Sequence, residues 1–142
     1  MTAASPDPAE IAEKLHSAAI HLLRRLRRQD VATGLTAPRL SALSVIVYAG
    51  PLTLGALAAA EQVRPPTITR IVAALEADGL VTREPSAEDR RVTRVRATPA
   101  GETLLHQGRR RRTAQLAAQL AALSPKERAT LALAADLLES LS

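Results

Sequence analysis

The sequence predicts a mainly α-helical (α+β) fold, in which a winged helix-turn-helix with a small β-hairpin is flanked by long N- and C-terminal helices. Three observations on the 142-residue chain support this prediction. Residues 53–79 follow the order of a short Ala-rich helix, a turn and a second helix. Two short strand patterns come next, separated by a charged loop at residues 85–91. Apolar stripes with helical spacing occupy both ends of the chain.

The first half of the chain contains three predicted helices. Residues 7–29 form the first, because apolar side chains recur there every three or four positions. The second begins near Thr36, a residue type that caps helices, and ends at Gly50. Thr53 is expected to cap a third helix over residues 54–62, whose alanines allow another helix to pack closely.

The helix that follows is the predicted recognition helix, at residues 65–78. It is closed by Gly79, because glycine readily adopts the left-handed conformation that a helix end needs. Its buried side is expected to consist of four apolar residues, Ile68, Ile71, Val72 and Leu75. Residues 80–84 and 92–97 then read as the two strands of a short edge ribbon.

Two long helices are predicted for the remainder of the chain. Thr98 followed by Pro99 is a helix-start signal, and this helix runs to about Ala122. Ser124 and Glu127 repeat the signal as a capping box for the last helix.

The chain is expected to form one structural domain with three segments. Residues 1–34 would be an N-terminal dimerisation helix, residues 35–98 the winged helix-turn-helix DNA-binding module, and residues 99–142 the C-terminal dimerisation helices. The terminal stripes have no sheet to cover them, so they are expected to pack against one another and against a second copy. A two-fold dimer would also place two recognition helices about 34 Å apart on a pseudo-palindromic duplex.

Composition permits a DNA-binding role and excludes several others. The net charge is +5 and 17 of the 19 basic residues are arginine, whose planar fork suits phosphate and guanine, although a GC-rich genome produces the same bias. The absence of cysteine excludes disulfides, a thiol switch and a Cys-based zinc site. No apolar run approaches the roughly 20 residues of a membrane span, and no signal peptide is evident, so a cytoplasmic protein is expected.

No catalytic or metal site is predicted. The sequence contains no nucleophile at motif spacing from a base and no phosphate-binding loop, so an enzyme is not expected and no cofactor is implied. The three histidines, His16, His21 and His106, do not share a helix face, so a metal site is not expected either.

The ordered set of motifs resembles the MarR (multiple antibiotic resistance regulator) family of bacterial transcription factors. Asp89-Arg90-Arg91, five residues and then Ala97-Thr98 are similar to the family's wing motif, Asp-x-Arg, five residues, Leu-Thr. Further matches are Thr67-Ile68-Thr69-Arg70, Leu75-Glu76, Gly79-Leu80-Val81 and Arg83. The resemblance implies a triangular homodimer joined through its first and last two helices, which represses nearby genes and is often released by a small anionic or aromatic molecule.

The sequence departs from the family pattern at two places. Ala97 stands where the wing motif has leucine, which weakens a packing position. Arg64 stands where the recognition helix ordinarily has a Ser or Thr cap, and it is followed by Pro65 and Pro66. A missing cap costs about 1 kcal/mol, which the prolines offset in part because they lack an N–H that needs a partner. Fewer N–H groups are then left to bind a phosphate.

The candidate DNA-binding residues lie on the recognition helix and the wing. Thr67, Thr69 and Arg70 are predicted to read the major groove, and Arg91, directed by Asp89, to enter the minor groove. The whole candidate set is Arg64, Pro66, Thr67, Thr69, Arg70, Asp89, Arg90, Arg91 and Arg94. Each of these groups also fits a plain solvated surface. No effector-binding residue is predicted.

Two other functions fit the same fold. One is a winged-helix module that works through protein contacts, and the other is a sequence-indifferent, architectural DNA binder. Residues 61–98 hold seven arginines against six acidic residues, which is not the broad positive field that indifferent binding needs.

The arginine run 109–112 leaves its own alternatives open. Arg109 and Arg112 interrupt an apolar stripe. Their stems could lie along that stripe with the charged ends in water, or the guanidinium groups could meet carboxylates such as Glu10 or Glu13, or a bound anion.

Overall fold

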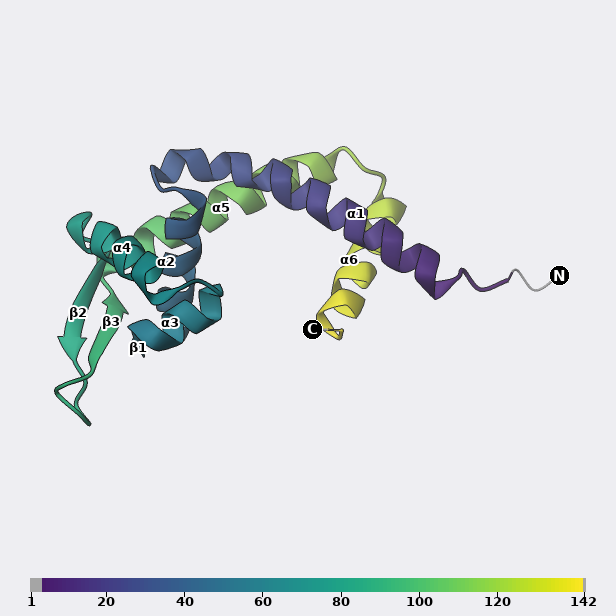
Figure 1. Ribbon diagram of the computed structural model, residues 1–142. Helices are drawn as coiled ribbons and strands as arrows, with labels where there is room; N and C mark the ends of the chain where they lie inside the picture. The colour runs from purple at the N-terminus through teal and green to yellow at the C-terminus, as the bar shows by residue number, and fades with distance from the viewer. Residues whose placement is uncertain (1–3, 142) are drawn as a thin grey trace. The chain divides into compact units, whose positions relative to one another are not determined.

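The structure, a computed structural model, describes residues 4–141 and consists of two compact units (Figure 1). One unit is the continuous segment 27–109. The other combines residues 4–26 with residues 110–141. The long helix α5 begins in the first of these units and ends in the second.

The unit at residues 27–109 contains the predicted helix-turn-helix. Its helices are the 3₁₀ helix η1 (Arg28–Thr33), α2 (Ala37–Ala49), α3 (Leu54–Glu61), α4 (Pro65–Ala77) and the first part of α5 (Pro99–Ala121). The predicted cap of α3 is confirmed, because the Thr53 hydroxyl oxygen accepts a hydrogen bond from the Ala56 N–H at 3.1 Å. The predicted end of α4 is confirmed as well, with Gly79 at φ 73°.

A small antiparallel sheet completes this unit. It comprises β1 (Leu52–Thr53), β2 (Val81–Pro85) and β3 (Thr93–Ala97) in the order β1-β3-β2. The predicted hairpin is confirmed as β2–β3, whereas β1 was not predicted from the sequence. β1 pairs Leu52 with Val95 and Thr53 with Arg94, so β3 is the central strand rather than one edge of a two-stranded ribbon.

The hydrophobic core of the chain lies between these helices and the sheet. Its fully buried large side chains are Leu43, Ile46, Leu57, Ile68, Leu75, Val72, Val81 and Val95. Ile68, Val72 and Leu75 are the predicted buried side of α4, while the fourth predicted member, Ile71, is half-buried against the same core. The opposite side of α4 is therefore free to face a partner.

Thr98 joins the end of α4 and the sheet to the start of α5. Its hydroxyl donates to the Gly79 carbonyl oxygen at 2.7 Å, and its N–H donates to the Leu80 carbonyl oxygen at 3.0 Å. The Gly101 N–H in turn donates to the Thr98 hydroxyl oxygen at 3.1 Å, which confirms Thr98 as the cap of α5. Gly101 is buried directly over the Leu80 carbonyl.

The second unit consists of α1 (Pro8–Arg27), the last part of α5 and α6 (Pro125–Glu139). The predicted capping box is confirmed, since the Ser124 oxygen accepts from the Glu127 N–H at 3.1 Å and the Glu127 carboxylate accepts from the Ser124 N–H at 2.9 Å. Neither α1 nor α6 contains a buried residue. Large apolar side chains on or next to these helices remain exposed, namely Ile11, Leu15, Ile20, Leu22, Leu23, Leu131, Leu133, Leu137, Leu138 and Leu141.

Candidate nucleic-acid interface

Residues 65–68, in the first turn of α4, offer no free backbone donor. Arg64 is the N-cap in an extended conformation and its side chain makes no capping hydrogen bond. Pro65 and Pro66 lack an N–H, and the N–H groups of Thr67 and Ile68 both donate to the Arg64 carbonyl oxygen, at 3.0 and 3.2 Å. Helix N-termini bind phosphate through free N–H groups, so residues 65–68 offer a nucleic acid their side chains instead.

The exposed side of α4 carries the residues predicted to meet the major groove. Arg64, Pro66, Thr67, Thr69 and Arg70 are all exposed. The Thr69 hydroxyl donates to the Pro65 carbonyl oxygen at 2.9 Å, so its proton is used within the helix. The structure thus places these five candidates together at the N-terminal half of α4.

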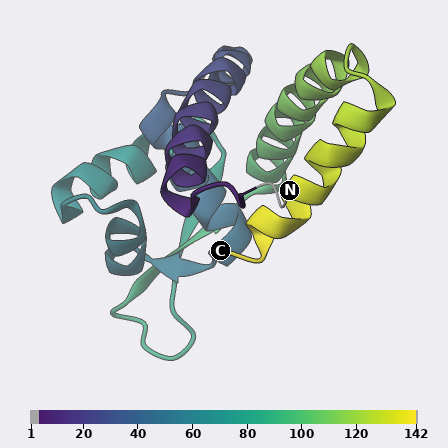
Figure 2. The same cartoon turned by 90° about the vertical axis from the view of Figure 1, so that its right-hand side faces the viewer.

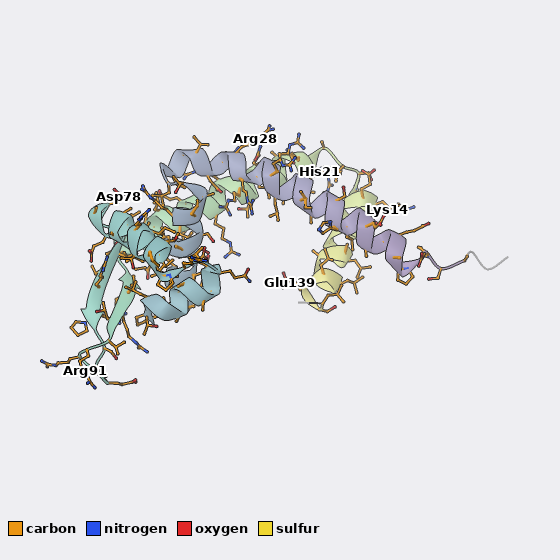
Figure 3. All side chains as sticks on the ribbon, viewed as in Figure 1. Lys14, His21, Arg28, Asp78, Arg91 and Glu139 are labelled. Atoms are coloured by element: carbon orange, nitrogen blue, oxygen red, sulfur yellow. The ribbon has the colours of Figure 1, made fainter. Side chains whose placement is uncertain are left out.

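The wing presents an arginine that a carboxylate holds in place. The Asp89 carboxylate accepts hydrogen bonds from the Arg91 N–H at 3.0 Å, from Arg91 Nε at 3.2 Å and from Arg91 Nη2 at 3.4 Å. The Arg91 side chain is nevertheless 91% exposed. Figure 3 places it at the far end of the hairpin, and Figure 2 shows the loop that carries it extending beyond the strands. This is the arrangement that the sequence predicts for Asp89 and Arg91.

The pairing also affects the ionisation of the carboxylate. The hydrogen bond from the Arg91 backbone N–H, followed by the one from its guanidinium, lowers the pKa of Asp89 below the ordinary value of 3.8. Asp89 therefore stays charged at neutral and mildly acidic pH, and the contact with Arg91 persists there.

The loop that carries the pair has internal support. The Val92 N–H donates to the Asp89 carbonyl oxygen at 3.0 Å, and the Ser86 N–H donates to the Val92 carbonyl oxygen at 2.7 Å. Ser86 is buried, and its hydroxyl oxygen accepts from the Glu88 N–H at 3.3 Å. Arg90 lies in the same loop and is exposed.

Two other arginines of the hairpin form ion pairs, one with the neighbouring strand and one with α4. Arg96 Nε lies 3.0 Å from Glu84 Oε1, in an ion pair that joins the two strands of the hairpin. Arg83 Nε lies 3.6 Å from Glu76 Oε1, which joins β2 to α4. Arg94 is half-buried in the central strand, opposite Glu84 and Thr53.

The arginine run on α5 makes a contact that was not predicted. Arg109 is exposed, and its Nη1 donates to the Tyr48 hydroxyl at 3.4 Å. The neighbouring Arg111 was not singled out from the sequence, yet its Nε and Nη2 are buried without a hydrogen-bond partner among residues 4–141. Gln115 Oε1, one helical turn further along α5, is also buried without a hydrogen-bond partner among these residues.

Two other features bear on the class of protein. No single helix in the described part of the chain is long and apolar enough to cross a membrane. No group of three or more His, Asp or Glu within residues 4–141 is placed to hold a metal ion.

An exposed second helix and a basic hairpin beside it, on one three-helix core, define a winged helix-turn-helix protein. The sequence profile of the MarR family matches residues 35–93. An HTH-type transcriptional regulator of Mycobacterium tuberculosis is 39% identical over 133 residues, which cover 94% of this chain and 93% of that protein. The chain belongs to the MarR family of transcriptional regulators.

Solved structures agree with the fold. A putative transcriptional regulator from Pseudomonas aeruginosa is 31% identical and superimposes with a TM-score of 0.79, covering 96% of this chain and 97% of that one. A variant of MepR from Staphylococcus aureus, bound to an oligodeoxyribonucleotide, has 20% identity and a TM-score of 0.71 over 93% of this chain and 98% of that one.

Proposed function

We propose that this MarR-family regulator is a homodimer that binds a pseudo-palindromic operator in double-stranded DNA and represses nearby genes in the cytoplasm. The observation that carries the proposal is the pairing, within one compact unit, of an exposed recognition helix with a wing arginine held by a carboxylate. These two elements are suited to a major and a minor groove respectively.

Each candidate residue has a distinct role in this proposal. Arg70 would direct its fork to guanine O6 and N7 from the exposed side of α4. Arg91 would enter the narrow minor groove, where negative potential is strongest, in the direction that Asp89 imposes. Arg64 and Arg90, both exposed, would neutralise phosphates beside these contacts.

The second copy follows from how the apolar surface is distributed. Every buried residue of the described chain lies within the unit at 27–109, so α1 and α6 leave their leucines and isoleucines in water. A second chain placed on these helices would cover their exposed apolar side chains.

Size-exclusion chromatography with light scattering, at micromolar concentration, tests the homodimer. We expect a mass of about 30 kDa, twice the 15.0 kDa of one chain. Truncation after Ser124 removes α6 and should give monomeric or insoluble protein that no longer binds an operator. A full-length species of 15.0 kDa would contradict the proposed assembly.

A competition experiment separates the proposed function from its two alternatives. Labelled DNA from the chain's own promoter region is bound by the full-length protein and challenged with unlabelled promoter or random duplex. A sequence-specific regulator should be displaced by promoter DNA at far lower concentration, typically by a factor of about 10³ or more. Equal competition would indicate an architectural binder, and no binding would indicate a protein-interaction module.

Arg70→Ala tests the assignment of α4 to the major groove. A bidentate arginine–guanine pair gives about 1–3 kcal/mol of discrimination, so its loss should lower the preference for one base pair per half-site about tenfold. Affinities for duplexes that carry each base at that position provide the measurement. Unchanged preference at every position would show that Arg70 does not read a base.

Release by a small anionic or aromatic ligand belongs to the same proposal. Tyr48 is the single Phe, Tyr or Trp side chain of the sequence, so a ligand ring could not be stacked between two such side chains of one chain. A pocket for such a ligand would have to be lined by leucine and alanine.

A further inference from the structure

The backbone at the start of α4 is poor in hydrogen-bond donors. Pro65 and Pro66 have none, and the next two backbone N–H groups are already bonded to the Arg64 carbonyl. Two exposed pyrrolidine rings therefore stand where a helix N-terminus would otherwise present N–H groups to phosphate or bases.

Thr69, one turn further along α4, also lacks a free hydrogen-bond donor in its side chain. A threonine hydroxyl ordinarily donates or accepts, but here its proton is directed at the Pro65 carbonyl oxygen, at 2.9 Å. The residue is exposed, so it offers a partner its methyl group and the remaining lone pairs of its oxygen. It cannot donate to a base without breaking the bond to Pro65.

An apolar stripe results along the exposed side of the helix. Pro66, Thr69 and Ala73 are separated by three and four residues, which places them on one face of α4, and all three are exposed. Arg70 lies next to this stripe, and its long, exposed side chain can donate hydrogen bonds. In the major groove the one apolar group on a base edge is the C5-methyl of thymine, and threonine methyls and alanine are the side chains that contact it.

We propose that α4 reads thymine through its C5-methyl group, with Thr69 and Ala73 as the specificity-determining residues and Pro66 extending the contact. This inference rests on the proposed function. The operator should therefore carry thymine next to the base pair that Arg70 reads, in each half-site.

Replacing thymine with deoxyuridine tests the proposal, because it deletes the methyl group and leaves base pairing unchanged. The operator is first recovered by selection from a random duplex library with the full-length wild-type protein. Each thymine is then replaced singly and in symmetry-related pairs, and affinity is measured by fluorescence anisotropy at fixed salt. Loss of one buried methyl should weaken binding about three- to fivefold, and about tenfold or more when both half-sites are changed. Replacements outside the contacted positions should stay within about twofold and serve as the control.

Two substitutions of Thr69 separate methyl contact from hydroxyl contact. Thr69→Val keeps a methyl on the same branch and removes the hydroxyl, so affinity and sensitivity to deoxyuridine should both stay within about twofold of wild type. Thr69→Ser keeps the hydroxyl and removes the methyl. Its affinity for the thymine operator should fall about three- to fivefold, and it should lose sensitivity to deoxyuridine at one position per half-site.

These experiments distinguish failure of thymine-methyl recognition from failure of the proposed function. If selection recovers no preferred sequence, the proposed function fails and this inference falls with it. If an operator is recovered but deoxyuridine weakens wild-type binding at no position, recognition of the thymine methyl is refuted and the proposed function stands. Loss of binding by folded Thr69→Val, with Thr69→Ser unaffected, would assign the contact to the hydroxyl instead. The wild-type series decides the matter even if a variant does not fold.

Discussion

Replacing Gly101 with alanine is expected to destabilise the protein by at least about 3 kcal/mol, at the upper end of what overpacking causes. A Cβ at this position would overlap the carbonyl oxygen of Leu80 and lie 3.3 Å from Leu43 Cδ1. The Leu80 carbonyl cannot easily move aside, because it accepts the Thr98 N–H at 3.0 Å. The new methyl group would therefore force α5 away from the sheet.

Chemical denaturation followed by circular dichroism is the appropriate measurement, since the chain has no tryptophan and one tyrosine. Variants should be compared at equal protein concentration because the proposed state is a dimer.

Gly108→Ala is the matched control in the same helix. Gly108 is also buried, but its Cβ would meet only Thr33 Cγ2 at an ordinary 3.5 Å. Alanine there should be neutral or stabilising by up to about 1 kcal/mol. Equal effects of the two substitutions would show that the close approach at Gly101 is not what matters.

The features that sequence reasoning predicted are the ones set by neighbouring residues. Thr53 caps α3 and Ser124 with Glu127 caps α6 through bonds that span three residues, so the residue types suffice to locate them. Gly79 ends α4 for a similarly local reason. The Asp89–Arg91 contact also spans two positions, which is why the wing pair was predictable.

The features that sequence reasoning missed depend on residues distant along the chain. β1 has only two residues, too few for an alternating pattern, and it exists because Leu52 and Thr53 pair with Val95 and Arg94. The need for glycine at position 101 arises from the approach of α5 to Leu80, and no local pattern marks it. The burial of Arg111 Nε and Nη2 likewise leaves no signal in a run of four arginines.

Arg91→Ala should weaken operator binding about a hundredfold in a homodimer, because each of two wings would lose a contact of about 1.4 kcal/mol. The loss should be largest on operators with AT-rich flanks, where the minor groove is narrowest. Fluorescence anisotropy at fixed salt, with flanks of varied composition, measures it. A uniform loss on all flanks would indicate a plain phosphate contact instead.

Asp89→Ala provides the sharper test, because two physical effects predict opposite signs. Removing an acidic residue near DNA should tighten binding by simple electrostatics. However, an arginine side chain that is 91% exposed loses up to about 2 kcal/mol of rotamer freedom when it is fixed, and Asp89 already restrains it before DNA arrives. We expect the second effect to prevail, with a loss of up to about tenfold for the dimer.

Glu88→Ala is the matched control for this substitution. Glu88 carries the same charge in the same loop, and its side chain makes no ion pair among the described residues. Its removal should leave binding unchanged or slightly tighter.

Because hydrogen bonds from Arg91 lower the pKa of Asp89, the Asp89–Arg91 pair is present above the ordinary value of 3.8 and is lost only as the pH falls through the lower folded value. The difference between wild type and Asp89→Ala should thus stay constant from about pH 5 to pH 8. If Asp89→Ala binds as tightly as Glu88→Ala, Asp89 does not orient Arg91 and the wing acts only through its charge.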